Sequence, residues 1–167
     1  APTLTMQYES PFGMLMPIGG YAMAAMRHMH DYGTSGEQLA EVAVAARAWA
    51  SLNPAATRRE PISVDDVLAS PMVSDPLHKL DACLVTDGGG AVVVTSAERA
   101  RSLNSKPIYV RGFGESHTHW TIAQMPDLTL TTAADTGRRA MSMAGIRHDD
   151  VDVAQIYDSF TITVLLT

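Results

Sequence analysis

Two short apolar runs flank a turn in the stretch Asp81-Ala82-Cys83-Leu84-Val85-Thr86-Asp87-Gly88-Gly89-Gly90-Ala91-Val92-Val93-Val94. An Asp-Gly turn between runs that are rich in β-branched residues is typical of a β-hairpin. Because the runs are continuous and do not alternate with polar residues, both strands are expected to be buried on two faces. We therefore predict a hairpin over residues 81–95, inside an α/β fold. No Lys-Ser/Thr pair and no helix follow the three glycines, which argues against a phosphate-binding loop.

Helical patterns precede this hairpin. Residues 1–18 mix Pro and Gly with apolar side chains, which predicts a buried irregular loop. Residues 20–32 have a broad apolar helical face, and Gly33 follows where a C-terminal cap belongs. Thr34 with Glu37 fits a capping box that opens a second helix.

That second helix is expected to end at Asn53-Pro54, because proline disfavours helix at the residue before it. Ser63 with Asp66 fits another capping box, for a short helix that ends at Ala69. After the hairpin, capping residues, glycines and apolar runs predict further elements: a helix from Ser96 to Leu103, a strand over 107–112, a helix from Thr132 or Asp135 to Met143, a strand over 151–156, and a helix or strand over 159–167.

Composition excludes several classes of protein. The formal net charge of −6 and the pI near 5.4 argue against nucleic-acid binding, since such proteins concentrate Lys and Arg on one face. A phosphorylated ligand would then need local cations such as Arg27, Arg58 or Arg59. No apolar run is long enough to span a membrane and residues 1–5 do not resemble a signal peptide, so we expect a cytoplasmic protein.

Cysteine and methionine usage adds two expectations. Cys83 is the single cysteine, which excludes an internal disulfide and a cysteine-based zinc cluster. Within an apolar strand and without a basic neighbour it is expected to be a buried, inert thiol. Six of the ten methionines lie in the first thirty residues, where they either fill a core or line an adaptable apolar ligand site.

Candidate site residues gather at the end of the last predicted buried strand. Tyr157-Asp158-Ser159-Phe160 follows that strand, and catalytic groups collect at strand ends in α/β folds. A phenol is a directional donor and acceptor at neutral pH, although a packed tyrosine explains the residue equally well. Glu115, His117 and His119 alternate and would share one face of an extended segment, where they line a pocket or face solvent; we expect no metal site.

Taken in order, these segments resemble the thiolase superfamily over nearly the whole chain. The wording Tyr32-Gly33-Thr34-Ser35 and Tyr157-Asp158-Ser159-Phe160 resembles the branch of sterol-carrier-type thiolases and steroid side-chain aldolases. The resemblance implies an internal fragment of a layered α/β/α/β/α fold, of which only the middle portion is present. Residues 1–80 would be the loop domain that covers CoA, 81–105 the end of the N-terminal half, and 106–167 the start of the C-terminal half.

The resemblance also implies chemistry. Thiolases have Asn or His where this sequence has Tyr157, and their nucleophilic cysteine would lie upstream of Ala1, with the His and second Cys motifs beyond Thr167. A retro-aldol cleavage of a β-hydroxyacyl-CoA, on a steroid side chain or another bulky acyl group, needs only a base and an acid or oxyanion donor. Tyr157 would serve as that base or donor, with Asp158 orienting it.

Binding residues and partners follow from the same kinship. Phe12, Met14, Arg58 and Trp120 are expected to contact CoA or its acyl group, with CoA as part of the substrate and no covalently bound cofactor. A homodimer and a separate zinc-containing OB-fold partner are also implied, and the chain alone is expected to be inactive. Two alternatives stay open: a sterol-carrier-type thiolase that transfers an acyl group to CoA, and a non-catalytic acyl-CoA-binding subunit.

Overall fold

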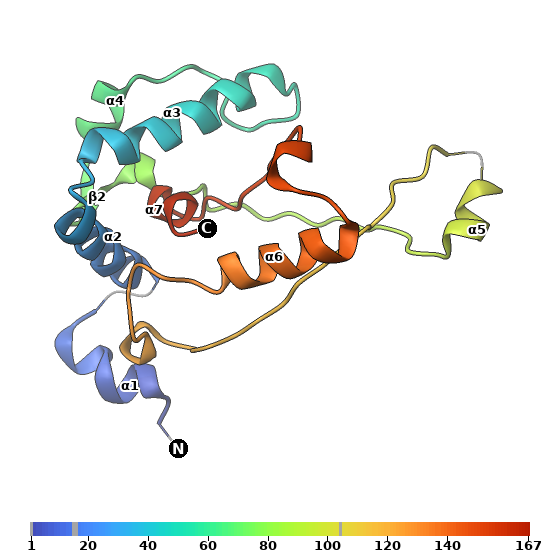
Figure 1. Ribbon diagram of the computed structural model, residues 1–167. Coiled ribbons are helices and arrows are strands. Elements are labelled where there is room, and N and C mark those ends of the chain that lie inside the picture. The colour runs from blue at the N-terminus through green and yellow to red at the C-terminus, as the bar shows by residue number, and fades with distance from the viewer. Residues whose placement is uncertain (1, 15–16, 104) are drawn as a thin grey trace. The chain divides into compact units, whose positions relative to one another are not determined.

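The computed structural model describes residues 2–14, 17–103 and 105–167, and most of its regular structure is helical (Figure 1). Short 3-10 helices (η) and one small sheet accompany the α-helices. In chain order the elements are α1 Leu4–Tyr8, η1 Ser10–Phe12, α2 Ile18–Tyr32, α3 Gly36–Leu52, α4 Val64–Leu68, β1 Met72–Ser74, β2 Leu77–His78, η2 Lys79–Asp81, α5 Ala97–Arg101, η3 Ile122–Gln124, α6 Ala133–Ala144, η4 His148–Asp150 and α7 Thr161–Leu165.

The chain divides into two units. The first unit consists of Ala1–Cys83, His117–Ala133 and Gln155–Thr167, and the second of Leu84–Ser116 and Ala134–Ala154. The domain ranges 1–80, 81–105 and 106–167, which follow the expected halves of a thiolase, remain a prediction.

The core of the first unit forms where α7 packs against α2 and α3. Buried side chains from these helices, from β2 and from the residue before α7 meet there: Ala22, Ala25, Leu39, Leu77, Phe160 and Ile162. β1 and β2 pair in antiparallel fashion close to this core. Burial of these apolar side chains is what joins residues 155–167 to the N-terminal helices.

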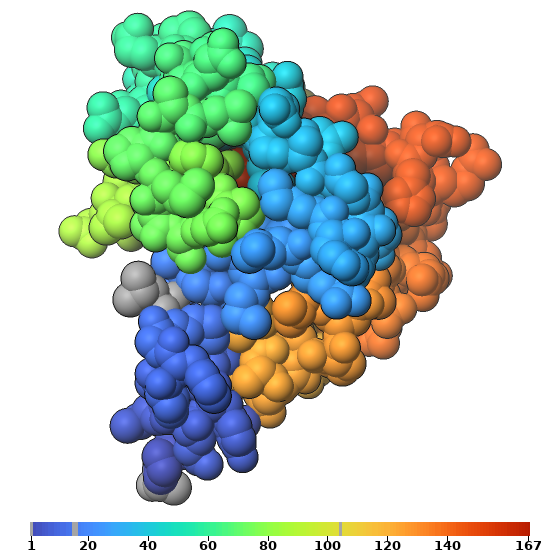
Figure 2. Space-filling view, turned by 90° about the vertical axis from the view of Figure 1, so that its left-hand side faces the viewer, coloured from blue at the N-terminus to red at the C-terminus, as the bar shows by residue number. Residues whose placement is uncertain are grey.

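A buried carboxylate joins the N-terminal segment to the segment 117–133. Glu9 is 2% exposed, and its Oε1 accepts a hydrogen bond from the backbone N–H of Ala123 at 3.1 Å. Figure 2 shows the N-terminal segment, in dark blue, beside the orange segment that carries η3, and α1 contacts η3. The carboxylate thus satisfies a donor at the start of η3 that no backbone carbonyl reaches.

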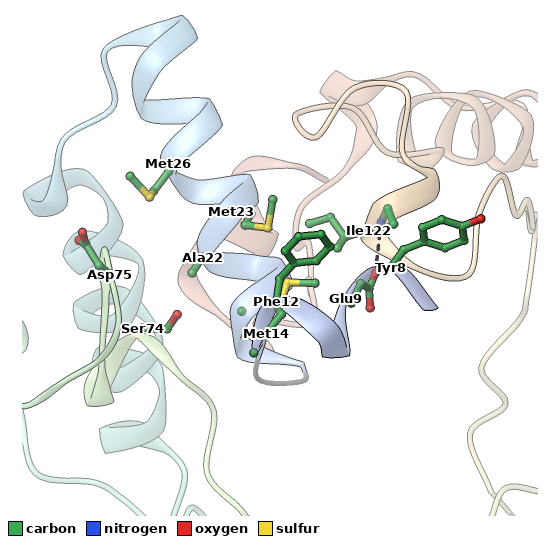
Figure 3. Close-up of a pocket in the computed structure, with 13 residues that line it drawn as sticks. Tyr8, Glu9, Phe12, Met14, Ala22, Met23, Met26, Ser74, Asp75 and Ile122 are labelled. Atoms are coloured by element: carbon green, nitrogen blue, oxygen red, sulfur yellow. Dashed lines mark hydrogen bonds between the residues drawn. The ribbon is translucent and has the colours of Figure 1, made fainter. Parts of the chain in front are cut away.

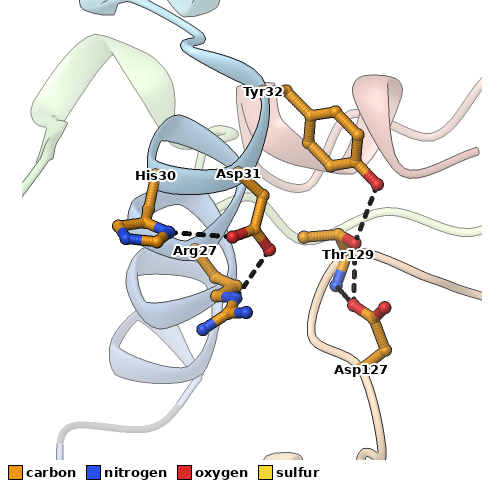
Figure 4. Close-up of polar contacts among 6 residues, drawn as sticks. All are labelled: Arg27, His30, Asp31, Tyr32, Asp127 and Thr129. Carbon is orange, nitrogen blue, oxygen red and sulfur yellow. Dashed lines mark hydrogen bonds and ion pairs between the residues drawn. The ribbon is translucent and has the colours of Figure 1, made fainter.

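Polar contacts form at the end of α2 and within the segment 117–133, and one of them joins the two (Figure 4). Asp31 accepts from Arg27 at 2.6 Å and pairs with the ring of His30 at 2.8 Å. Asp127 accepts from the backbone N–H and the hydroxyl of Thr129, whose hydroxyl lies 3.5 Å from that of Tyr32. The bond to His30, followed by the one to Arg27, lowers the pKa of Asp31, and the bonds from Thr129 lower that of Asp127.

In the second unit an extended segment runs closely along α6. A Cβ added at Gly112 would overlap the carbonyl oxygen of Ala140, and one added at Gly114 would overlap that of Thr136. Arg111 extends from the same segment and donates to the carbonyl oxygen of Ala144 at 2.9 Å, which satisfies a carbonyl at the end of α6. The absence of side chains at the two glycines is what lets the backbones approach.

Local helix signals are largely confirmed. Gly33 and Gly145 adopt left-handed conformations, with φ of 69° each, after α2 and α6. The Ser63–Asp66 capping box is present. The box before α3 is one residue later than predicted, with Ser35 and Gln38 in place of Thr34 and Glu37, because both pairs satisfy the same spacing and the helix begins at Gly36.

Four other predictions are wrong. The described residues of the stretch 1–18 are not an irregular loop throughout, since α1 and η1 form there, with Thr3 capping α1; for residues 1, 15 and 16 the prediction lies outside the described residues. The runs 82–85 and 91–94 do not pair with each other, and 107–112 and 151–156 are not strands. A two-stranded hairpin is marginal without further strands and a covering layer; accordingly, Val92, Val93 and Val94 are 85–92% exposed here, not buried.

Gly112→Ala and Gly114→Ala are each expected to destabilise the protein by about 1–3 kcal/mol, because the methyl group meets backbone that has nowhere to move. Gly137→Ala in α6 is the matched control: no atom lies within 4 Å of its added Cβ, so it is expected to stabilise by roughly 0.5–1 kcal/mol. Urea denaturation measures all three. If Gly112→Ala and Gly137→Ala unfold at the same urea concentration, Gly112 is not closely packed against the backbone of α6.

Acid is expected to weaken the contacts at the end of α2. A carboxyl whose pKa is lowered on folding stabilises the folded state above its ordinary value of 3.8, and this stabilisation is lost as pH falls through the lowered pKa. The free energy of unfolding should fall from about pH 5 to pH 2, and less steeply in Asp31→Asn and Asp127→Asn. Urea denaturation across this pH range measures the effect, with Asp87→Asn, at an exposed position, as control. If the free energy of unfolding of Asp31→Asn and Asp127→Asn falls with pH as steeply as that of the wild type, the prediction is wrong.

Candidate functional site

Tyr157 lies shortly before the start of α7, in the segment Gln155–Thr167 of the first unit. Ala82 and Phe160 form an isolated antiparallel bridge, and the N–H of Cys83 donates to the carbonyl oxygen of Ser159 at 3.0 Å. This pairing sets Cys83 opposite Ser159 and diagonal to Tyr157. Diagonal neighbours on one face of an antiparallel pair are within reach of an aromatic side chain.

Tyr157 is 75% exposed. The charge of Cys83, followed by its hydrogen bond, raises the pKa of Tyr157 above the ordinary 10.0; desolvation, Tyr21 and Asp158 act in the same direction. The phenol is therefore protonated throughout the neutral range, which suits a hydrogen-bond donor better than a base.

Cys83 is itself a correction to the sequence analysis. Its thiol is exposed and is not buried in a strand. Because the hairpin does not form, the residue pairs instead with the segment before α7. Sequence patterns did not indicate this contact.

A buried carboxylate fixes the backbone on which Tyr157 lies. Asp81 is 5% exposed, and its Oδ1 accepts from the hydroxyl of Thr161 at 2.8 Å while its Oδ2 accepts from the N–H of His78 at 2.8 Å. The ring Nδ1 of His78 lies 3.7 Å from the same Oδ2. Asp81 therefore joins η2 to the start of α7, just beside the bridge that carries Cys83.

One cavity of the first unit gathers part of the methionine-rich N-terminal sequence. It has a volume of about 470 Å³ and is lined by Phe12, Met14, Met23, Met26 and Ile122 among others, with Glu9, Ser74 and Asp75 as its polar members (Figure 3). Ligand sites of proteins are typically apolar hollows of about 300–1,000 Å³ with a few polar groups. The cavity therefore brings together two of the residues that the sequence analysis selected, Phe12 and Met14.

A second cavity of the first unit has a volume of about 340 Å³. Its wall includes Tyr21 of α2 together with His119, Trp120 and Thr163. The ring of Tyr21 stacks on that of Phe160, with centroids 4.4 Å apart. This stacking connects the cavity to the segment of Tyr157. Trp120, 88% exposed, thus lines this second cavity, whereas Phe12 and Met14 line the first.

The remaining predicted residues are placed differently. Arg58 is exposed on the loop between α3 and α4 and lines neither cavity. Asp158 is half-buried beside Tyr157. In residues 2–14, 17–103 and 105–167, no three His, Cys, Asp or Glu side chains gather in a way that could hold a metal ion. No helix of that part of the chain has the length and apolar character needed to cross a membrane.

Glu9, Tyr21 and Cys83 are site residues that sequence reasoning missed. Each is defined by a contact with a segment far along the chain: Glu9 with Ala123, Tyr21 with Phe160, and Cys83 with Ser159. A lone acidic residue in a Pro- and Gly-rich stretch gives no signal of such a contact.

Comparison with known proteins now identifies the fold. A solved structure named Ltp2-ChsH2(DUF35) aldolase superposes with a TM-score of 0.89 at 35% identity, over 95% of this chain and 43% of that one. A family model described as thiolase C-terminal domain-like matches residues 114–167. The fold is thiolase-like. The resemblance drawn from the sequence is thereby confirmed.

Curated relatives match nearly the whole thiolase-like chain. A steroid side-chain-cleaving aldolase of Thermomonospora curvata is 36% identical over 93% of the chain and 41% of its own length. An acetyl-CoA acetyltransferase of Methanothermobacter thermautotrophicus is 35% identical over 96% of the chain and 42% of its own length. A 17-hydroxy-3-oxo-4-pregnene-20-carboxyl-CoA lyase of Mycobacterium tuberculosis is 34% identical over 95% and 43%. The chain thus spans about two fifths of the length of these relatives.

Removal of the Asp81 carboxylate tests how the Tyr157 segment is held. Asp81→Ala leaves the buried Thr161 hydroxyl without its partner and removes the acceptor of the half-buried His78 N–H, which is expected to cost about 1–3 kcal/mol. Urea denaturation should show this loss, whereas the exposed Glu41→Ala on α3 should stay within about 0.5 kcal/mol of the wild type. If Asp81→Ala leaves the free energy of unfolding almost unchanged, Asp81 does not anchor this segment.

Proposed function

We propose that the thiolase-like chain is part of an enzyme that cleaves a C–C bond of an acyl-CoA by a retro-aldol reaction on a β-hydroxyacyl-CoA. The observation that carries the proposal is the phenol of Tyr157, exposed at the entrance to α7 and held in its protonated form. The kinship with proteins named as a steroid side-chain-cleaving aldolase and a carboxyl-CoA lyase supports it. A bulky acyl group, such as a steroid side chain, is the substrate class we favour.

In this reaction a base takes the proton of the β-hydroxyl group, the bond between the α- and β-carbons breaks, and a carbonyl compound leaves. The electron pair passes to the α-carbon and the thioester oxygen, and the enolate then takes up a proton. Tyr157 supplies the hydrogen bond that stabilises this oxygen as charge develops. Its raised pKa is consistent with the donor role, and Asp158 orients the phenol from the neighbouring position.

The two cavities support the handling of acyl-CoA. We assign the apolar cavity of Phe12 and Met14 and the cavity of Trp120 to the acyl group and the pantetheine arm of CoA. The exposed Arg58 is then available to the phosphates, in a loop domain formed by residues 1–80. CoA enters as part of the substrate and no bound cofactor is required by this scheme.

A partner protein belongs to the proposal. The solved structure named as an Ltp2-ChsH2(DUF35) aldolase joins an aldolase to a DUF35 protein in its name. We propose that this protein acts as a homodimer, and that a DUF35-type protein is the zinc-containing OB-fold partner expected from the sequence.

A thiolase that transfers an acyl group to CoA is the second candidate, favoured by the relative named acetyl-CoA acetyltransferase. The two reactions differ in their substrates and in their demand for free CoA. A non-catalytic acyl-CoA-binding subunit is the third, and it makes the phenol of Tyr157 dispensable.

The test uses the complete natural polypeptide, with and without a DUF35-type partner. Incubation with a β-hydroxyacyl-CoA should release an aldehyde or ketone without added CoA, measured by chromatography. Tyr157→Phe should lower kcat by about 10²-fold, as loss of an oxyanion donor does, with little change in KM. Tyr109→Phe, which changes an exposed tyrosine that lines neither cavity, should leave turnover unchanged.

Other outcomes decide between the candidates. Cleavage of a β-ketoacyl-CoA that depends on added CoA, without cleavage of the β-hydroxyacyl-CoA, would replace the aldolase by the thiolase. Full turnover of Tyr157→Phe in the assembled complex would favour the binding subunit.

A further inference from the structure

The cavity lined by Phe12 and Met14 contains a buried carboxylate of which one oxygen is not hydrogen-bonded. Glu9 belongs to the wall of this cavity and is 2% exposed. Its Oε1 accepts from the backbone N–H of Ala123, whereas its buried Oε2 has no hydrogen-bond partner in the part of the chain that the structure describes. Buried polar atoms of proteins are nearly always hydrogen-bonded, and an unpaired one is destabilising. Oε2 therefore indicates a donor that a bound molecule supplies.

The polar groups of this cavity lie at its two ends. Figure 3 shows Ser74 and Asp75 on one side of the methionine side chains and Glu9 on the other. The side chains between these ends are mostly apolar and include Phe12, Met14, Ala22 and Met23. Methionine side chains are unbranched and adapt their conformation to a bound group, so they can move to admit one to Oε2.

The chemistry of the wall restricts which ligand group can bind. None of the described residues that line the cavity is Lys, Arg or His, so a phosphate or carboxylate would be buried there without a counter-charge. An ionised carboxylate only accepts hydrogen bonds, so Glu9 and Asp75 cannot satisfy carbonyl oxygens such as those of the pantetheine amides. A hydroxyl group can donate to Glu9 while the rest of the ligand stays in apolar surroundings. The wall thus favours a neutral, apolar group that carries a hydroxyl.

We propose that this cavity binds the far end of a bulky acyl group and that Glu9 selects a hydroxyl at that end over a ketone. The inference rests on the proposed function for its substrate class, an acyl-CoA with a bulky acyl group. Oε2 accepts from the ligand hydroxyl, which completes the hydrogen bonding of a carboxylate already held at Ala123. A ketone in the same place leaves two acceptors facing each other without a donor, and such a mismatch is strongly disfavoured. Glu9 is a specificity-determining residue and takes no part in bond cleavage.

Two thioesters that differ at a single position test the proposal by binding alone. Lithocholoyl-CoA has a hydroxyl on the first ring of its steroid, and 3-oxocholanoyl-CoA has a ketone there; neither has a β-hydroxyl group to be cleaved. The complete natural polypeptide should bind lithocholoyl-CoA about ten- to a hundredfold more tightly than the ketone, the effect of one hydrogen bond to a charged group. Isothermal titration calorimetry measures both dissociation constants.

Glu9→Gln is the matched variant. Its amide oxygen can still accept from Ala123, while its NH₂ group, in place of Oε2, donates to a ketone. The variant should therefore fold, which urea denaturation checks, and its preference for the hydroxyl should disappear or reverse. Glu41→Gln, at an exposed position on α3 that lines neither cavity, should keep the wild-type preference.

Three results would overturn the role of Glu9. They are equal affinities of the wild type for the two thioesters, binding of neither thioester, and a hydroxyl preference that Glu9→Gln keeps but Asp75→Asn, at the other end of the cavity, abolishes. The proposed function fails separately, because it depends on release of an aldehyde or ketone from a β-hydroxyacyl-CoA, whereas these measurements involve no turnover. A protein that discriminates the two thioesters but cleaves no β-hydroxyacyl-CoA would retain this inference and refute the retro-aldol reaction.

Discussion

The buried carboxylate of Asp81 is the constraint on which the candidate site depends. It accepts from the backbone of His78 and from the hydroxyl of Thr161, two residues that lie far apart in the sequence. Leu77 and Ile162, fully buried next to these partners, exclude water from the contact. Buried polar groups are costly unless they are all paired, so these hydrogen bonds specify a single alignment of the two segments. The bridge between Ala82 and Phe160 and the hydrogen bond from the N–H of Cys83 to the carbonyl oxygen of Ser159 follow from that alignment.

Helix boundaries were predictable because their causes are local. A left-handed glycine at position 33 or 145 and a capping box at Ser63 are decided by neighbours within a few residues. The shift of the other box, from Thr34 to Ser35, shows the limit of this reasoning: two overlapping pairs meet the same spacing, and only the packing of α3 selects between them.

Strands were not predictable in the same way, because pairing requires a partner that the pattern does not name. The runs around Val85 and Val93 have the composition of buried strands but find no neighbouring strand in this structure. The residues of the candidate site also divide into those suggested by local sequence and those that depend on long-range contacts. Tyr157, Phe12 and Met14 are candidates that the sequence proposes and that stay predictions, whereas Cys83 and Glu9 acquire their surroundings only through long-range contacts.

The close approach of the extended segment to α6 constrains length as well as composition. Gly112 and Gly114 are two residues apart, so they present the same face of the segment to the helix. Inserting or deleting one residue just before them would reverse the alternation and turn Arg111 or Phe113 toward a backbone that tolerates no Cβ. In homologous chains, gaps in this segment should therefore come in pairs, or be absent.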